Sequence, residues 1–255
     1  MEREQYAIMA RREERHWWYA GMRRVALAVL DHALGTTPGG PRRILDAGCG
    51  TGGTTIALQR FGEVVGIDLA WEALGPASGR GLGGHLARAS IEHLPFGPAT
   101  FDAVTSFEVI YHLGVSSDLA AFGELRRVLK PGGLLLVRVP AHDWLRGAHD
   151  RLVHTRHRYT RGELASKLQQ AGFVIQQLSW ANTLLFPPAV AKRLLERADG
   201  HNNDEVSAAG EPDLWQPPAA LNALLESAVA VEALAIPHGV PLPFGLSVLA
   251  VARAT

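Results

Sequence analysis

Three glycines near the start of the chain have types and spacing suited to holding a nucleoside-bearing ligand. In ILDAGCGTGG, residues 44–53, Gly48, Gly50 and Gly53 follow the spacing G-x-G-x-x-G after a short apolar run. Glycines between a strand and a helix let the backbone come close to a ligand. Asp68, twenty positions after Gly48, is suited to accept hydrogen bonds from ribose hydroxyls. These residues predict a nucleoside cofactor, and they fit a dinucleotide as well as any other kind.

A group of histidines could act as general bases. Histidine titrates near neutrality and can accept a proton from a reacting hydroxyl, an effect typically worth about 10²- to 10⁴-fold in rate. The candidates are His112, His142, His149, His154 and His157. A metal site is a weaker interpretation of the histidines between 149 and 157, because no carboxylate pair accompanies them. We therefore predict no metal.

The elements that must position these residues alternate along the chain. The alternation predicts a doubly wound α/β fold with a mostly parallel sheet, whose ligand lies at the carboxyl ends of the strands. The final apolar run, residues 245–254, is expected to be a closing edge strand. The expected strands cover about 43–48, 63–69, 101–110, 134–140, 174–180 and 245–254, and the expected helices about 54–61, 118–130 and 161–173.

Four segments follow from this pattern. Residues 1–41 are expected to form N-terminal helices that act as a lid or cap, and residues 42–182 the cofactor-binding core. Residues 183–243 are expected to be a helical insertion that caps the substrate, because added segments at this edge of a sheet often carry specificity. Residues 244–255 then return to the core as the closing strand.

Composition limits the class of protein. The 25 basic and 25 acidic residues cancel, which favours a small-molecule partner over nucleic acid. A single cysteine and a charged N-terminal segment favour the cytoplasm. Four polar residues interrupt the apolar stretch 219–236, which argues against a membrane span and predicts a core helix, a dimer interface or an apolar acceptor pocket. We expect a monomer or a homodimer.

Four further features resemble the class I methyltransferases that use S-adenosylmethionine. They are Asp46, LPFGPATFDAV at 94–104, FEVIYHL at 107–113 and LRRVLKPGGLLLV at 125–137, all in the order and spacing of that family. The resemblance covers about residues 42–140. It implies a Rossmann-like, doubly wound sheet of seven strands, mostly parallel with an antiparallel last strand, together with a helical cap. It also implies S-adenosylmethionine as the cofactor.

The resemblance assigns the glycine loop to the homocysteine part of this cofactor. Asp46, Gly48, Gly50 and Gly52 match the family's first motif, in which an acidic side chain helps to hold the cofactor's ammonium group. Cys49, between two of these glycines, is expected to be a small residue that fits a tight turn. A cationic sulfonium compound suits a nearby carboxylate, whereas a pyrophosphate would not.

The same resemblance assigns the adenosine part and the methionine part. Asp68 matches the acid that binds both ribose hydroxyls, and Leu69 lies beside the adenine. Ser90 and Ile91 occupy the position at the adenine amino group, where many relatives carry Asp instead of serine. Phe107 and Glu108 match the positions beside the methionine portion of the cofactor. His112 matches a position that faces the substrate pocket.

A second resemblance concerns the histidine-rich segment. HWWY at 16–19, HD at 149–150 and HTRHRY at 154–159 resemble a bacterial subgroup of small-molecule methyltransferases with HD, H and RY in this interval. We predict catalytic roles for His112, His149 and His154, and contacts with substrate for Trp17, Trp18, His157, Arg158 and Tyr159. The structural alternative is that HD pins a loop, Arg156 and Arg158 form ion pairs, Tyr159 packs under the next helix and at least one tryptophan packs in the core.

The resulting hypothesis is methyl transfer to a small apolar metabolite at an oxygen atom, either a hydroxyl or a carboxylate. An arginine at 138, 146, 156 or 158 could bind an acidic group of that acceptor. The alternatives are methylation at nitrogen or carbon, or a non-methylating step such as cyclisation with the cofactor bound. An NAD-dependent oxidoreductase and a regulatory binding protein are less favoured by the first motif.

Overall fold

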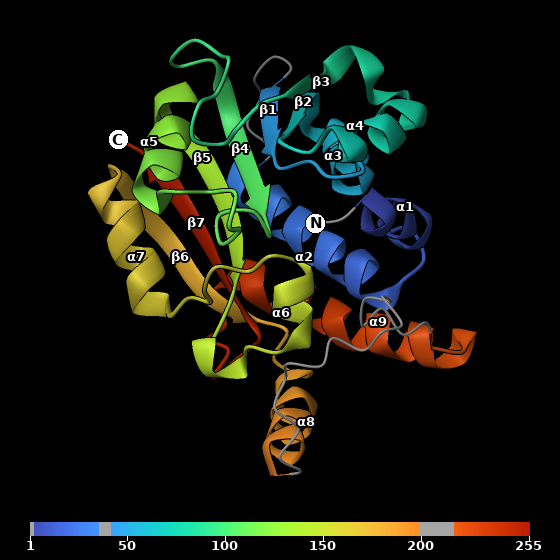
Figure 1. The fold of residues 1–255 in the computed structure, drawn as a ribbon. Helices are drawn as coiled ribbons and strands as arrows, with labels where there is room; N and C mark the ends of the chain where they lie inside the picture. The colour runs from blue at the N-terminus through green and yellow to red at the C-terminus, as the bar shows by residue number, and fades with distance from the viewer. Residues whose placement is uncertain (1–2, 36–41, 199–216) are drawn as a thin grey trace.

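The computed structural model describes residues 3–35, 42–198 and 217–255, and its centre is a seven-stranded sheet (Figure 1). The strand order is β3-β2-β1-β4-β5-β7-β6. Chain order reverses at β1, which puts its carboxyl end at the switch point where ligands bind in such sheets. The strands are β1 Arg42–Ala47, β2 Gly62–Asp68, β3 Leu86–Arg88, β4 Phe101–Phe107, β5 Leu129–Pro140, β6 Phe173–Ala181 and β7 Ser247–Ala254.

The first five strands pair in parallel, and β7 runs antiparallel to both of its neighbours. This confirms the predicted fold, a mostly parallel doubly wound sheet with an antiparallel last strand. The prediction that residues 244–255 close an edge is wrong, because β7 lies between β5 and β6 and the edges are β3 and β6. Almost every residue of β7 is buried, as expected for an apolar run in the interior of a sheet.

Helices cover both faces of the sheet (Figure 1). Helices α5 and α7 bury leucines and Phe122 against one face, and α2, α3 and α9 bury Val25, Leu58 and Val229 against the other. The α-helices are α1 Arg3–Arg12, α2 Trp17–Leu34, α3 Gly53–Leu58, α4 Trp71–Ala77, α5 Asp118–Val128, α6 Ala148–Leu152, α7 Arg161–Gln170, α8 Phe186–Ala198 and α9 Ala219–Ala235.

The helical insertion packs on the N-terminal helices. Val229 of α9 lies so close to Gly21 of α2 that a Cβ there would come within 2.7 Å of its side chain. Asn222 accepts a hydrogen bond from the Trp17 amide at 3.0 Å, and Glu232 accepts from the amide of Asn182 at 2.8 Å. Helix α9 is therefore anchored by its glycine contact and by the polar residues that interrupt its sequence.

The outer face of the insertion is apolar. One described stretch, Ala219–His238, is long and apolar enough to cross a membrane by length and composition alone. Its outward side chains include Leu224 and Leu234, while Glu226 forms an ion pair with Arg24 of α2. Helix α8 projects away from the sheet (Figure 1). Two stretches whose sequences are typical of loops and turns, DGHNNDEVSAAGEP at 199–212 and most of GTTPGGP at 35–41, lie outside the described residues.

Candidate functional site

The glycine loop joins β1 to α3 at the carboxyl edge of the sheet. Gly48, Gly50 and Gly52 have φ values of 91°, 54° and 87°, in the left-handed region that favours glycine. The amides of Gly48 and Cys49 both donate to the carbonyl of Ile67 at 2.8 Å, which ties the loop to β2. The sequence predicted this loop because its turn chemistry is local.

Asp68, the last residue of β2, lies directly beside the glycine loop. Its carboxylate accepts hydrogen bonds from the amides of Gly50 at 2.9 Å and Ala70 at 2.8 Å. Burial raises the pKa of Asp68, and these amides oppose that rise. A carboxylate fixed in this way can accept hydrogen bonds from a ligand hydroxyl.

Asp46, in β1, is enclosed more completely than Asp68. Its two oxygens accept from the hydroxyls of Thr55 at 2.7 Å and Thr105 at 2.9 Å, and the residue is 2% exposed. Burial raises the pKa of Asp46 to about 6, although both hydroxyls oppose the rise. Contact with a cofactor ammonium stays a prediction for this residue.

The other residues assigned to the cofactor lie around this edge. Cys49 is buried, and burial raises its thiol pKa, so its side chain is a packed neutral group. Leu69 is 48% exposed beside Asp68, which leaves an apolar surface next to the acid. Ser90 accepts from the amide of Glu92 at 3.2 Å, and Ile91 is buried. Their contacts with adenine stay predictions.

Glu108 and the buried Arg138 form a partly buried ion pair where β4 and β5 end. The Arg138 Nε donates to Glu108 Oε1 at 2.9 Å, and the Tyr111 side chain also hydrogen-bonds to Glu108. Glu108 has a φ of 59°, an uncommon backbone conformation for this residue type. Arg138 lies 5.5 Å from the ring centre of Trp18 and 5.2 Å from that of Phe107. These five side chains make a charged and aromatic site at the centre of the edge.

The two tryptophans of α2 have different surroundings. Trp18 lines a small cavity of about 30 Å³ together with Tyr19, Phe107 and Arg138. The Trp17 amide is bonded to Asn222 of α9, and its indole Nε1 is buried. Of the two tryptophans assigned to the substrate, Trp18 thus lies beside Arg138 and Phe107, and Trp17 lies toward the insertion.

His112 and His154 lie on two segments that pair beyond β4. The backbone of His112 bridges to Thr155, and the Leu113 amide donates to the His154 carbonyl at 2.9 Å. The His112 ring stacks on Tyr111 at 5.1 Å between ring centres. Burial lowers the pKa of His112 to about 4, below the near-neutral value that best suits a general base.

The HD and RY residues make contacts within the protein, as expected if they hold a loop in place and do not bind substrate. Arg158 donates to both oxygens of Asp150 at 2.8 and 3.0 Å. Tyr159 is fully buried, and its hydroxyl donates to Asp118 at 2.6 Å. The side chain of His149 lies outside the described part of the structure. Substrate contacts of Arg158 and Tyr159 stay predictions that these contacts do not favour.

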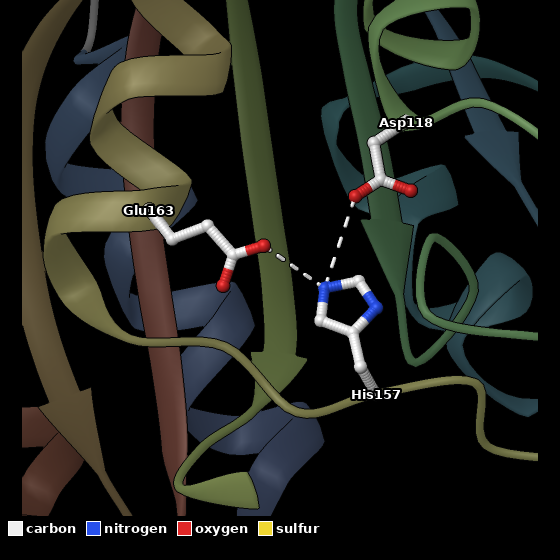
Figure 2. Close-up of side chains that lie close together, drawn as sticks. All are labelled: Asp118, His157 and Glu163. Atoms are coloured by element: carbon white, nitrogen blue, oxygen red, sulfur yellow. Dashed lines mark hydrogen bonds and ion pairs between the residues drawn. The ribbon is translucent and has the colours of Figure 1, made fainter.

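His157 belongs to a cluster with Asp118 and Glu163 (Figure 2). Its Nε2 lies 3.1 Å from Glu163 Oε1 and 3.9 Å from Asp118 Oδ2, a geometry that could hold a metal ion. However, the ammonium of Lys167 already lies 2.5 Å from Asp118 and 2.6 Å from Glu163, and Arg156 also pairs with Asp118. These cations neutralise the carboxylates, so we interpret the cluster as an ion-pair network that anchors the segment to α5 and α7.

Sequence reasoning missed two residues at this edge. Glu13 lies over Gly53, and Arg80 pairs with Glu13 at 2.7 Å. The two are 67 positions apart and belong to no local motif, so nothing in the sequence pairs them. The amphipathic pattern of the first helix indicated only that one of its faces is buried, and it did not identify the residues on which that face packs.

The donors and acceptors of this edge fit S-adenosylmethionine. Asp68 can accept from hydroxyls of its ribose, and the glycine loop leaves the backbone free of Cβ atoms beside a ligand. The carboxylate at position 46 suits a compound with a sulfonium and an ammonium group. Fold and site together define a Rossmann-like protein of the class that binds a nucleoside cofactor at the switch point.

Comparisons with known proteins identify the family. Residues 45–137 match the family model described as "Methyltransferase domain". The chain is 30% identical to the uncharacterized methyltransferase sll0829 of Synechocystis sp. over 154 residues, which are 56% of this chain and 70% of that protein. The chain therefore belongs to the class I methyltransferases that depend on S-adenosylmethionine, and that compound is its cofactor.

Two further similarities have narrower scope. The chain is 38% identical to a malonyl-[acyl-carrier protein] O-methyltransferase of Enterobacter lignolyticus over 104 residues, 40% of this chain and 41% of that protein. It thus spans less than half the length of this relative. Phosphoethanolamine N-methyltransferase 2 of Haemonchus contortus, solved with S-adenosyl-L-methionine, has a TM-score of 0.56 at 22% identity, covering 89% of this chain and 51% of that chain. That likeness shows the shared fold.

Proposed function

We propose that this protein transfers a methyl group from S-adenosylmethionine to an oxygen atom of a small, partly apolar molecule in the cytoplasm. The observation that carries the proposal is the loop with three left-handed glycines, held beside the fixed carboxylate of Asp68. When bound, the cofactor supplies an electrophilic methyl group. The chain itself would supply position: an enclosed site that aligns reactants can reach effective molarities of about 10⁵ to 10⁸ M.

Aromatic side chains support a partly apolar acceptor. His142 follows β5 and stacks on Trp180 of β6 at 4.8 Å, while Phe186 and Phe244 lie 5.1 Å apart. Trp144, in the same cluster, is 43% exposed. Such rings favour contact with planar or apolar molecules and help to exclude water. They lie at the same edge of the sheet as Asp68 and Arg138.

Arg138 is the best candidate of the four arginines for an acidic group of the acceptor. It lines the cavity beside Trp18 and is 5% exposed. Arg138 is paired with Glu108, just as Arg156 and Arg158 are paired with Asp118 and Asp150, but of these three arginines only Arg138 lines that cavity. A carboxylate acceptor would need no base, whereas a hydroxyl acceptor would need one, for which His112 is the first candidate.

The test is release of S-adenosylhomocysteine by the purified chain with a panel of hydrophobic alcohols, phenols and carboxylic acids. Turnover with one of them and product methylated at oxygen is expected, with Asp68→Asn strongly impaired and Asp31→Asn, a surface control, unchanged. Methylation at nitrogen or carbon would correct the acceptor atom. Conversion of a compound without S-adenosylhomocysteine release would instead indicate a non-methylating step such as cyclisation.

A further inference from the structure

Helix α1 packs next to α4 (Figure 1), and its residue Met9 reaches Gly50 of the glycine loop. Tyr6, Met9 and Glu13 follow one another at intervals of three and four residues, which places them on one side of the helical segment. The charges of Asp68 and Glu72 act on the hydroxyl of Tyr6, whose pKa burial raises. The Tyr6 side chain therefore lies near the carboxylate of Asp68, which the sequence assigns to the ribose.

The other two side chains occupy the open side of the loop itself. A Cβ on Gly50 would lie 3.2 Å from Cε of Met9, and one on Gly53 would lie 2.6 Å from the carboxylate of Glu13. Glu13 is 6% exposed, and burial raises its pKa. The space that the glycines leave open is thus filled by this chain's own residues.

The room left beside these residues is small. The cavity lined by Glu13, Trp18 and Arg138 measures about 30 Å³. Pockets for small ligands usually measure about 300 to 1,000 Å³. A ligand group that lay against Gly50 and Gly53 on this side of the loop would overlap Met9 and Glu13 while α1 holds this position.

One residue fastens the end of α1. Arg80, in the short helical segment Ser78–Leu82 after α4, pairs through Nη2 with Glu13 at 2.7 Å and donates to the carbonyl of Ala10 at 2.9 Å. Its Nη1 also pairs with Glu14. The Arg80 side chain is only 15% exposed, so this three-point contact is partly shielded from solvent.

We propose that α1 is a plug that closes the cofactor site of the free protein, and that Arg80 and Glu13 are positioning residues that hold it there. The inference rests on the proposed function in one respect, namely that S-adenosylmethionine binds at the glycine loop. Entry of the cofactor requires α1 to move. The apparent dissociation constant then equals the intrinsic one divided by the fraction of molecules with α1 displaced.

Weakening the contact should accordingly strengthen cofactor binding. Arg80→Ala removes all three contacts and raises the open fraction, so we expect it to bind S-adenosylhomocysteine about 3- to 30-fold more tightly than the native chain. Glu13→Ala should act in the same direction because it removes the carboxylate over Gly53. A matched control is Arg60→Ala, which breaks the exposed pair with Asp31 far from the loop and should leave the affinity unchanged.

The experiment is titration calorimetry with S-adenosylhomocysteine, combined with hydrogen exchange of the amides in residues 3–14. In the native chain, exchange should become faster on adding the ligand, and in Arg80→Ala it should already be fast without it. Unchanged or weaker binding by Arg80→Ala, or slower exchange of α1 in the complex, would show a lid that closes on the ligand and overturn the proposal. Thermal unfolding of Arg80→Ala, Glu13→Ala and Arg60→Ala checks that all three variants fold.

The same titration separates this proposal from the proposed function. Equal affinity of the native chain and Arg80→Ala for S-adenosylhomocysteine would refute the plug and leave the cofactor assignment intact. No binding by the native chain and by either open variant would refute both, because the loop would then not be a site for this ligand.

Discussion

At the scale of single residues, the carboxylates of Asp46 and Asp68 are held in different ways. Asp68 is bound by two backbone amides, which favour its ionised form. Asp46 accepts hydrogen bonds from the hydroxyl groups of Thr55 and Thr105. Burial raises the pKa of both carboxyl groups, but only the one assigned to the ribose has backbone amides that oppose this rise.

Asp46 should make the stability of the protein depend on pH. Burial raises its pKa to about 6, so between pH 4 and 6 the native state holds a proton that the unfolded chain has lost. Stability from this group is therefore greatest at low pH and falls by about 2 to 3 kcal/mol as pH rises through that window. Urea unfolding of the native chain and Asp46→Asn from pH 4.5 to 7.5 should show their stability difference changing by roughly this amount. A constant difference would contradict the assignment.

His112 gives a second prediction at this scale, concerning the rate with a hydroxyl acceptor. Burial lowers its pKa to about 4, so the ring is neutral at pH 7 and becomes charged only in acid. If His112 is the base, kcat should stay level down to about pH 5 and then fall with an inflection near 4. His112→Gln should lower kcat by about 10²- to 10⁴-fold and leave the affinity for S-adenosylhomocysteine within about twofold. An inflection near 6.5 that survives the substitution would assign the proton to another histidine.

At the scale of elements, the parts that sequence could predict are those with local causes. The glycine loop and the helices after it follow from turn residues and from the period of apolar positions. The lateral place of β7 could not be predicted, because neighbours in a sheet are chosen by contacts far apart in the chain. For the same reason, the pairing of Asp150 with Arg158 and of Arg80 with Glu13 appears only in the folded structure.

Helix α9 should depend on one buried carboxylate for its position. Glu232 is 3% exposed and accepts from the amides of Asn182 and Thr183 at 2.8 and 2.7 Å. Glu232→Ala leaves both amides without an acceptor and should lower the free energy of unfolding by about 2 to 4 kcal/mol in urea titration. Glu226→Ala, which breaks a more exposed pair with Arg24 on the same helix, should cost at most about 1 kcal/mol. Equal losses would mean that α9 is held by its apolar contacts alone.

At the scale of the whole molecule, the site is assembled from segments distant in the chain. The loop comes from residues 48–53, the ion pair from the ends of β4 and β5, and an aromatic wall from Trp18 of α2. A ligand that binds the folded chain and not the unfolded one must stabilise the entire fold. Ligand-dependent unfolding therefore reports on the cofactor assignment without requiring a known acceptor.

S-adenosylhomocysteine should raise the thermal stability of the native chain, and a nicotinamide dinucleotide should not. At a concentration 100 times its dissociation constant, a ligand specific for the native state adds about 2.7 kcal/mol to the free energy of unfolding. For a chain of 255 residues this corresponds to a rise in Tm of about 5 to 10 °C. Asp68→Asn should lose most of this rise, because it replaces the carboxylate beside the loop, while Asp31→Asn should keep it. A larger shift with NADH than with S-adenosylhomocysteine would mean that the loop holds a pyrophosphate, and a shift retained in Asp68→Asn would place the ligand elsewhere on the molecule.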